Sequence, residues 1–96
     1  MACYFSANIR INNRDEYQKY LDSVDAVFSK FKGKYLAVDS SPVVLEGKRR
    51  YTKSVLIEFK NKQEFEKWYY SDDYQMILKH RLSAADCDTI LIEGVD

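Results

Sequence analysis

Residues 3–11 alternate strictly between two kinds of side chain, and this pattern constrains the fold more than any other in the chain. One face carries the apolar residues Cys3, Phe5, Ala7, Ile9 and Ile11. A period of two over this length predicts a β-strand with one apolar and one mixed face. Such a strand lies most simply in a sheet whose apolar face is covered by other elements.

The next segment changes to a helical period. Apolar residues recur at steps of three and four from Tyr17 to Phe31, which predicts one apolar stripe along a helix. Asn13 and Glu16 have capping-box spacing at its start. Gly33 follows the stripe, where a left-handed C-terminal cap is expected.

Further segments have the composition of strands. Residues 35–38 and 43–45 predict one long strand, bent at the proline between its two parts. Residues 46–53 read as a polar turn, and residues 54–60 and 89–93 predict the last two strands.

A second helix is expected to open at Asn61, with Glu64 at the capping-box position. Ser71 predicts a new N-cap that breaks this helix in two, because Asp72 and Asp73 follow it and complement a helix dipole. The apolar stripe predicted for the last helix is Tyr74, Ile77, Leu78 and Leu82.

The order βαββαβ predicts an α+β, ferredoxin-like fold in which one antiparallel sheet carries both helices on one face. The 96 residues contain no linker, repeat or low-complexity segment, so one domain over residues 1–96 is expected. The strand residues predicted to face the helices are Phe5, Ala7, Ile9, Val55, Ile57 and Phe59.

The other face of the sheet, called the free face below, is half apolar and half polar. It is expected to present Tyr4, Ser6, Asn8, Tyr35 or Leu36, Leu56, Glu58 and part of the last strand. An exposed patch of this kind usually marks an interface, most simply with an identical chain related by a twofold axis. A sheet that is simply wetted on one side is the alternative.

Tyr4, Tyr35 and Glu58 are the residues of this face most able to do chemistry. Two phenols and a carboxylate in a half-apolar cavity can orient a small polar ligand or assist proton transfer. They can equally anchor an interface, where tyrosine is enriched. The sequence leaves both interpretations open.

Composition excludes several classes of protein. Fifteen basic and fifteen acidic residues give a net charge of zero, which argues against a generic polyanion binder. No signal peptide or membrane-spanning run is recognisable, so a cytoplasmic location is expected. Cys3 and Cys87 are expected at opposite ends of neighbouring strands, too far apart for a disulfide, and their spacing matches no metal site. No cofactor or metal is expected.

The residues 48–53 form the densest basic run, KRRYTK. A nucleic-acid interface would use such a run on phosphates, but the strand that follows lacks the glycine and aromatic signature of RNA binders with this topology. A solvated hairpin tip that pairs with acids of a partner subunit is favoured over nucleic-acid binding.

Six motifs, in order and over nearly the whole chain, resemble those of the domain-of-unknown-function 1330 family. They are GKYL at residues 33–36, PVVLEG at 42–47, SVLIEF at 54–59, WYYSDDYQ at 68–75, RLSAA at 81–85 and IEG at 92–94. The resemblance implies protomers that pair sheet to sheet as a dimeric α/β barrel. Cofactor-independent monooxygenases, haem-degrading enzymes and small isomerases share that architecture.

The family has no established reaction, so the resemblance assigns no catalytic residue. It places the family's typical positions at Glu46, Glu58, Trp68, Tyr69, Tyr74 and Arg81. One departure concerns residues 39–41, where Asp-Ser-Ser replaces the Arg and Gly pair usual in the family. The acid reverses the local charge, which weakens any inference of an anionic ligand from relatives at that place.

These observations lead to the hypothesis of a homodimer, joined through the free face, whose barrel encloses a pocket for a small, partly apolar organic ligand. A cofactor-independent monooxygenase-like or isomerase-like activity is one version, and a non-catalytic binding or regulatory module is the alternative. Glu58 or Tyr35 would handle protons, with Arg81 or His80 as an ion partner at the rim. The expected pocket residues are Tyr4, Ser6, Tyr35, Leu56, Glu58 and Trp68.

Overall fold

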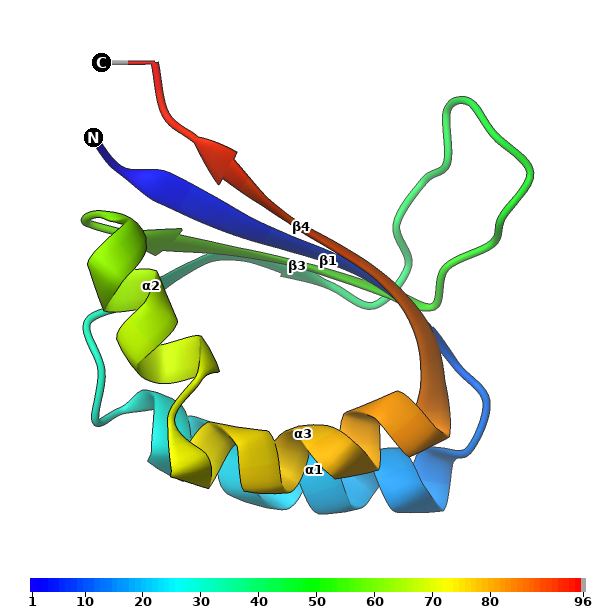
Figure 1. Cartoon of the computed structure of the whole chain (residues 1–96). Coiled ribbons are helices and arrows are strands. Elements are labelled where there is room, and N and C mark those ends of the chain that lie inside the picture. The colour runs from blue at the N-terminus through cyan, green and yellow to red at the C-terminus, as the bar shows by residue number, and fades with distance from the viewer. Residues whose placement is uncertain (96) are drawn as a thin grey trace.

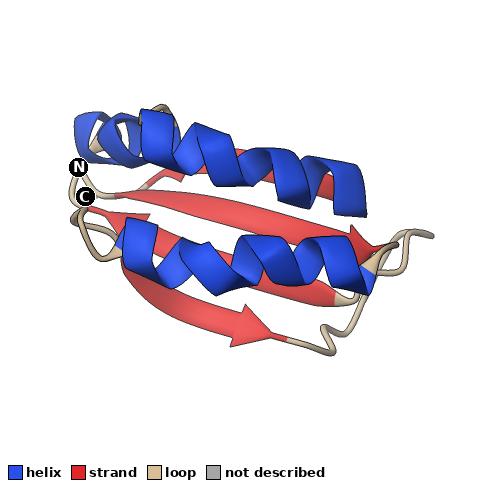
Figure 2. Cartoon of the chain, turned by 90° about the horizontal axis from the view of Figure 1, so that it is seen from below, coloured by secondary structure: helices blue, strands red, loops and turns tan. Residues whose placement is uncertain are grey.

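The computed structural model of the chain describes residues 1–95. Its elements follow the order β1 (Cys3–Ile11), α1 (Arg14–Phe28), β2 (Lys34–Asp39), β3 (Lys53–Phe59), α2 (Lys62–Tyr69), α3 (Asp72–Ala84) and β4 (Ala85–Glu93). The strands form an antiparallel sheet in the order β2-β3-β1-β4, and the helices all cover one of its faces (Figures 1 and 2). The predicted α+β fold and its βαββαβ order are confirmed.

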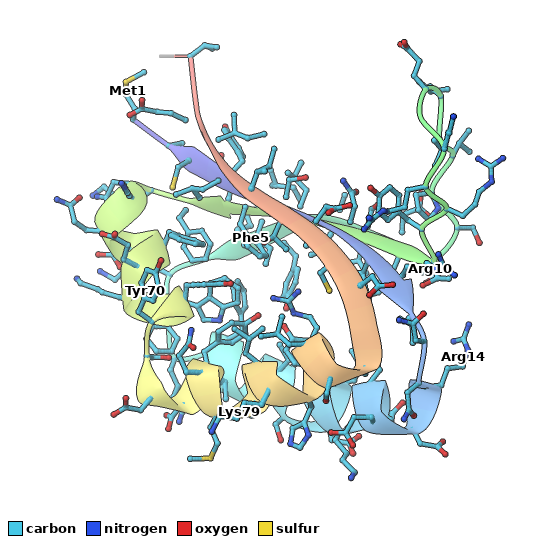
Figure 3. The ribbon with its side chains drawn as sticks, turned by 45° about the vertical axis from the view of Figure 1, so that its right-hand side comes forward. Met1, Phe5, Arg10, Arg14, Tyr70 and Lys79 are labelled. Atoms are coloured by element: carbon cyan, nitrogen blue, oxygen red, sulfur yellow. The ribbon has the colours of Figure 1, made fainter. Side chains whose placement is uncertain are left out.

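The central strand β1 decides which side chains face the helices. Phe5 lies opposite Ile57 on β3 and opposite Leu91 on β4. Directly opposed residues of antiparallel strands share a face, and Phe5 points into the space between sheet and helices (Figure 3). The core forms there, as the alternation predicted, and its most deeply buried large side chains are Trp68, Tyr74 and Phe59.

All three predicted N-caps form. Asn13 Oδ1 accepts a hydrogen bond from Glu16 N at 3.1 Å, and Asn61 Oδ1 accepts one from Glu64 N at 2.9 Å. Ser71 Oγ accepts from Tyr74 N at 3.1 Å and separates α2 from α3. Each cap satisfies a backbone N–H that has no partner inside the helix.

The predicted role of Gly33 is wrong. Helix α1 ends at Phe28, and within residues 1–95 only Gly47 has a positive φ. Gly33 is needed for space instead, because a Cβ there would lie 2.5 Å from Phe28 Cζ and 2.7 Å from Phe59 Cε1.

The prediction of one long strand through residues 43–45 is also wrong. Strand β2 ends at Asp39, and residues 40–52 leave the sheet on the side away from the helices (Figure 1). Val43 and Leu45 are 82% and 89% exposed. Apolar composition alone could not make a strand here, since β2 and β3 pair only through residues 34–39 and 54–58.

The stripe of α3 differs from the prediction by one residue. Leu82 is exposed, and the position of the next helical turn after Tyr74, Ile77 and Leu78 belongs to Arg81, which is 2% exposed. Strand β4 also begins earlier than predicted, at Ala85, because it pairs with β1 along that strand's whole length. None of the helices within residues 1–95 is long and apolar enough to span a bilayer.

Candidate functional site

The sheet separates the residues predicted to form one pocket into two groups. Tyr4 lies opposite Glu58, and Ser6 lies opposite Leu56, so these four share the free face. Tyr35 and Trp68 lie on the helix-covered side, packed with the core. Within this chain, therefore, Glu58 and Tyr35 cannot act together on the same ligand.

The sequence left open whether Tyr35 or Leu36 lies on the free face, and the structure excludes Tyr35. It lies opposite the buried Ile57, which places it on the helix-covered face, and its ring centroid is 4.6 Å from that of Phe28. A bulge follows between Tyr35 and Ala37. Leu36, the other candidate, is 43% exposed.

A cavity of about 460 Å³ lies between the sheet and helix α1. Its walls are mostly apolar, and three tyrosines, two cations and one carboxylate are set into them. The lining residues that carry polar groups are Tyr17, Tyr20, Tyr35, Asp25, Lys53, Trp68 and Arg81. Exposed Asp25 on α1 and exposed Val38 on β2 line it where it meets solvent.

Arg81 is the most unusual residue of this cavity. The sequence suggested an ion partner at the rim, but the side chain is buried and its Nη1 has no hydrogen-bond partner. Its Cζ lies 5.7 Å from the ring centroid of Tyr20, a cation–π contact. Among residues 1–95, no carboxylate forms an ion pair with it.

The buried tyrosines on and behind the cavity wall are protonated, and so can donate hydrogen bonds, at neutral pH. Burial raises the pKa of both Tyr17 and Tyr35 to about 12. Burial also raises the pKa of Tyr20 and of Tyr74, although Arg81 acts to lower the pKa of Tyr74. The Tyr20 and Tyr74 hydroxyl oxygens are 2.8 Å apart, so these two hydroxyls already share a hydrogen bond.

Lys53 is a cavity residue that the sequence analysis placed in a turn. It begins β3, opposite Ile9, and its Nζ lies 5.4 Å from the ring centroid of Tyr17. Burial lowers the pKa of Lys53, and Asp25 acts to raise it. The sequence could have predicted this position, because strand alternation puts Lys53 on the same face as Val55, Ile57 and Phe59.

His80 does not line this cavity. Its Nδ1 lies 2.5 Å from Glu16 Oε2, so it joins α3 to α1 near the molecular surface. This carboxylate partner of His80 was not predictable from the sequence, because Glu16 lies 64 positions away in the chain. His80 thus has Glu16 of the same chain as its partner and does not line the cavity that contains Arg81.

The basic run at residues 48–53 is partly neutralised within the same chain. Arg49 Nη1 lies 3.1 Å from Asp88 Oδ2, and the Tyr51 hydroxyl donates a hydrogen bond to the same oxygen at 2.7 Å.

Residues 39–41, where this chain departs from the usual family sequence, lie outside the cavity lining. The Asp39 carboxylate there accepts a hydrogen bond from Ser41 N.

Two further expectations concern cysteine and metal chemistry. Cys3 and Cys87 are free, and β1 pairs with β4 so that they lie at opposite ends of the ladder. In the part of the chain that the structure describes, no group of three or more potential metal-ligating side chains comes together.

Comparison with solved structures shows the fold of this chain in other proteins. A protein of unknown function from Rhodopseudomonas palustris is 17% identical, with a TM-score of 0.81, over 99% of this chain and 83% of that one. A dimeric ferredoxin-like protein of unknown function from Jannaschia is 8% identical, with a TM-score of 0.76, over 98% and 100% of the two chains.

A third similar structure is SnoaB from Streptomyces nogalater, described as a cofactor-independent oxygenase. It is 8% identical, with a TM-score of 0.69, over 99% of this chain and 94% of that one. At these identities the likeness establishes a ferredoxin-like fold, which some of the similar proteins combine with a dimeric state. A search of curated protein sequences finds no match.

The family assignment comes from the sequence itself. Residues 2–95 match the family described as Domain of unknown function (DUF1330). The match spans all the motifs quoted above and every strand and helix of the structure. The chain therefore belongs to the DUF1330 family.

Proposed function

We propose that this protein is a homodimer, joined through the free face, in which each subunit binds one small, mostly apolar organic molecule. The binding site is the cavity between the sheet and α1. The observation that carries the proposal is an apolar cavity of about 460 Å³ with a few polar groups set into its walls. Small-molecule sites in proteins have this size and this composition.

The free face supports the assembly. Ile90 and Ile92, opposite Ser6 and Tyr4, are 59% and 46% exposed on it, whereas the opposite face of the sheet is covered by helices. A contiguous apolar sheet face is a common site of association. Similar structures described as dimeric have the same ferredoxin-like fold.

Neighbouring residues on β3 offer a direct test of which face binds the ligand. Val55 lines the cavity, and Leu56 points to the free face. We expect Val55→Trp to fill the cavity and weaken binding of 2-naphthalenemethanol at least tenfold by calorimetric titration, while Leu56→Trp leaves it unchanged. Near-UV circular dichroism checks that both variants fold. Loss of binding in Leu56→Trp alone would place the site on the free face and overturn the proposal.

A catalytic version of this function is favoured by one observation, a half-buried lysine on the cavity wall. Burial lowers the pKa of Lys53, so a larger fraction of its amine is neutral and able to accept a proton than in an exposed lysine. The pKa values of Tyr17 and Tyr35 are raised, so these phenols stay protonated. Removal of a proton next to a carbonyl is a step that isomerases and cofactor-independent oxygenases can both use. Lys53, rather than Glu58 or Tyr35, is the base in this version.

Hydrogen exchange of 2-tetralone tests the catalytic version. In D₂O, a base at the cavity takes a proton from the carbon next to the carbonyl and returns a deuteron from solvent, which proton NMR follows. We expect the protein to accelerate this exchange, Lys53→Met to abolish the acceleration, and Glu58→Gln to leave it intact. An absence of acceleration in the wild type leaves the non-catalytic binding module as the function.

A further inference from the structure

We infer that the cavity selects an organic anion, an aromatic or aliphatic carboxylate, and that the guanidinium of Arg81 is its anchor. This inference rests on the proposed function, since it names the chemical class of the ligand for the same cavity. It adds a specific recognition group and a charge requirement that the shape of the cavity alone does not impose.

Arg81 is a buried charge without a countercharge among residues 1–95. Its side chain is 2% exposed, and its Nη1 contacts neither solvent nor any acceptor among residues 1–95. A guanidinium carries five donors and is always protonated. Burying such a group without a carboxylate partner is costly, so a ligand that supplies the missing acceptor is stabilised by the pairing.

The contacts that Arg81 makes supply no countercharge. The face of the Tyr20 ring offers a cation–π contact at 5.7 Å, and a hydrogen bond joins the side chains of Arg81 and Tyr74. Burial raises the pKa of both phenols, so they are neutral acceptors, and Nη1 of Arg81 still has no partner. Arg81 also lies in the last turn of α3, where the helix dipole favours a cation. That effect explains a positive charge at this end of the helix but not its full burial beside an apolar cavity, because the dipole interaction is smaller than the cost of burying an unpaired charge.

The cavity wall holds a second cation besides Arg81. Lys53 lines the same cavity with its Nζ over the ring of Tyr17. Arg81 acts to lower the pKa of Tyr17, so its charge also acts on this phenol. Two cations therefore lie around one group of tyrosines. Asp25 is the lining carboxylate, and it is exposed, so water screens it more than it screens Arg81. The interior of the cavity is electropositive.

Together these features define the ligand. A carboxylate can accept two parallel hydrogen bonds from one guanidinium, and protonated phenols can donate further hydrogen bonds to it. The apolar walls, formed by residues such as Phe5, Leu21, Val24 and Ile57, suit an aromatic or aliphatic body. A polyphosphate would require more donors than one buried guanidinium and one lysine provide.

A matched pair of probes tests the inference on the wild-type protein. 2-Naphthoate and 2-naphthalenemethanol share the same ring system and differ in charge. We expect calorimetric titration at neutral pH to show roughly ten- to hundredfold tighter binding of the naphthoate, the range for a hydrogen-bonded charge pair. Side-chain ¹⁵N NMR should show the Arg81 Nε–H resonance shifting with naphthoate and not with the alcohol, a readout that needs no variant.

Variants then assign the preference to Arg81. Arg81→Met should bind both probes equally, and Arg81→Lys should keep part of the preference, because it retains the charge without the planar fork. Lys79→Met is the control, since Lys79 lies on the same helix and points away from the sheet (Figure 3). It should behave as the wild type does.

The outcomes separate the two proposals. Equal binding of both probes by the wild type would overturn the anion inference and leave the proposed function in place. Binding of neither probe would overturn both. A preference for naphthoate that persists in Arg81→Met would refute the role of Arg81.

Discussion

Glu16 and His80 form a hydrogen-bonded pair that the sequence did not predict. Their separation of 64 positions is bridged by the packing of α1 against α3. The Asn13 cap fixes the first turn of α1, and Glu16 lies in that turn. A candidate catalytic histidine thereby becomes a residue with a structural partner.

This pair predicts a pH dependence of stability. The hydrogen bonds from His80 and Lys19 hold the pKa of Glu16 below its ordinary value of 4.5. A carboxylate whose pKa is lower in the folded protein stabilises it above the unfolded pKa, and this stabilisation is lost as the pH falls through the folded pKa. In urea unfolding from pH 7 to pH 3, Glu16→Gln should therefore be less stable than the wild type near pH 6 and converge with it in acid.

The control for that experiment is Glu66→Gln, which removes the same charge at an exposed position on α2. Its difference from the wild type should be smaller than that of Glu16→Gln near pH 6. If both variants gave the same difference at every pH, the Glu16 pairing would contribute nothing to stability.

At the scale of single elements, the features set by a few neighbouring residues were predictable from the sequence. The features set by pairing with a distant strand were not. The strand β1 and the three N-caps were predictable, because alternation and capping are properties of a few neighbouring residues. Residues 43–45 have the composition of a strand but no strand to pair with. The face of Tyr35 could not be predicted either, because a bulge follows it in β2.

The residues of α3 that face the core could also be predicted only in part. Helical spacing from Tyr74 predicts a buried residue at position 81, whereas apolar character predicts that Leu82 is buried. In the structure Arg81 is buried and Leu82 is exposed. Leu78 is 4% exposed and Leu82 is 59% exposed on the same helix. Leu78→Ala should cost about 3 kcal/mol of unfolding free energy through lost burial and a cavity, and Leu82→Ala less than about 0.5 kcal/mol.

Denaturant unfolding of the two alanine variants measures this difference directly, because the chemical change is identical at both positions. Similar costs at both positions would mean that Leu82 is as buried as Leu78, which would contradict the exposure of Leu82 in the structure.

At the scale of the whole molecule, the proposed function gives the two faces of the sheet separate roles, whereas the sequence-based hypothesis assigned both roles to the free face. Alternation showed that one face is mixed, and the candidate pocket was assigned to it. The structure instead places the cavity on the helix-covered side, where Arg81, Lys53 and Tyr35 meet from α3, β3 and β2. Bringing residues of three elements together is a tertiary property, and no local pattern encodes it. The free face is thereby left available for association.

The position of the dimer interface is the prediction that belongs to this scale. Ile90 on the free face and Leu82 on the helical side are each 59% exposed, so they form a matched pair. In a twofold interface each substitution occurs twice, and burying an unpaired carboxylate is costly. Ile90→Glu should weaken the dimer at least roughly a hundredfold, while Leu82→Glu leaves it intact, as measured by light scattering coupled to size-exclusion chromatography. A wild type that is monomeric at micromolar concentration would contradict the assembly, and dissociation by Leu82→Glu alone would move the interface to the helices.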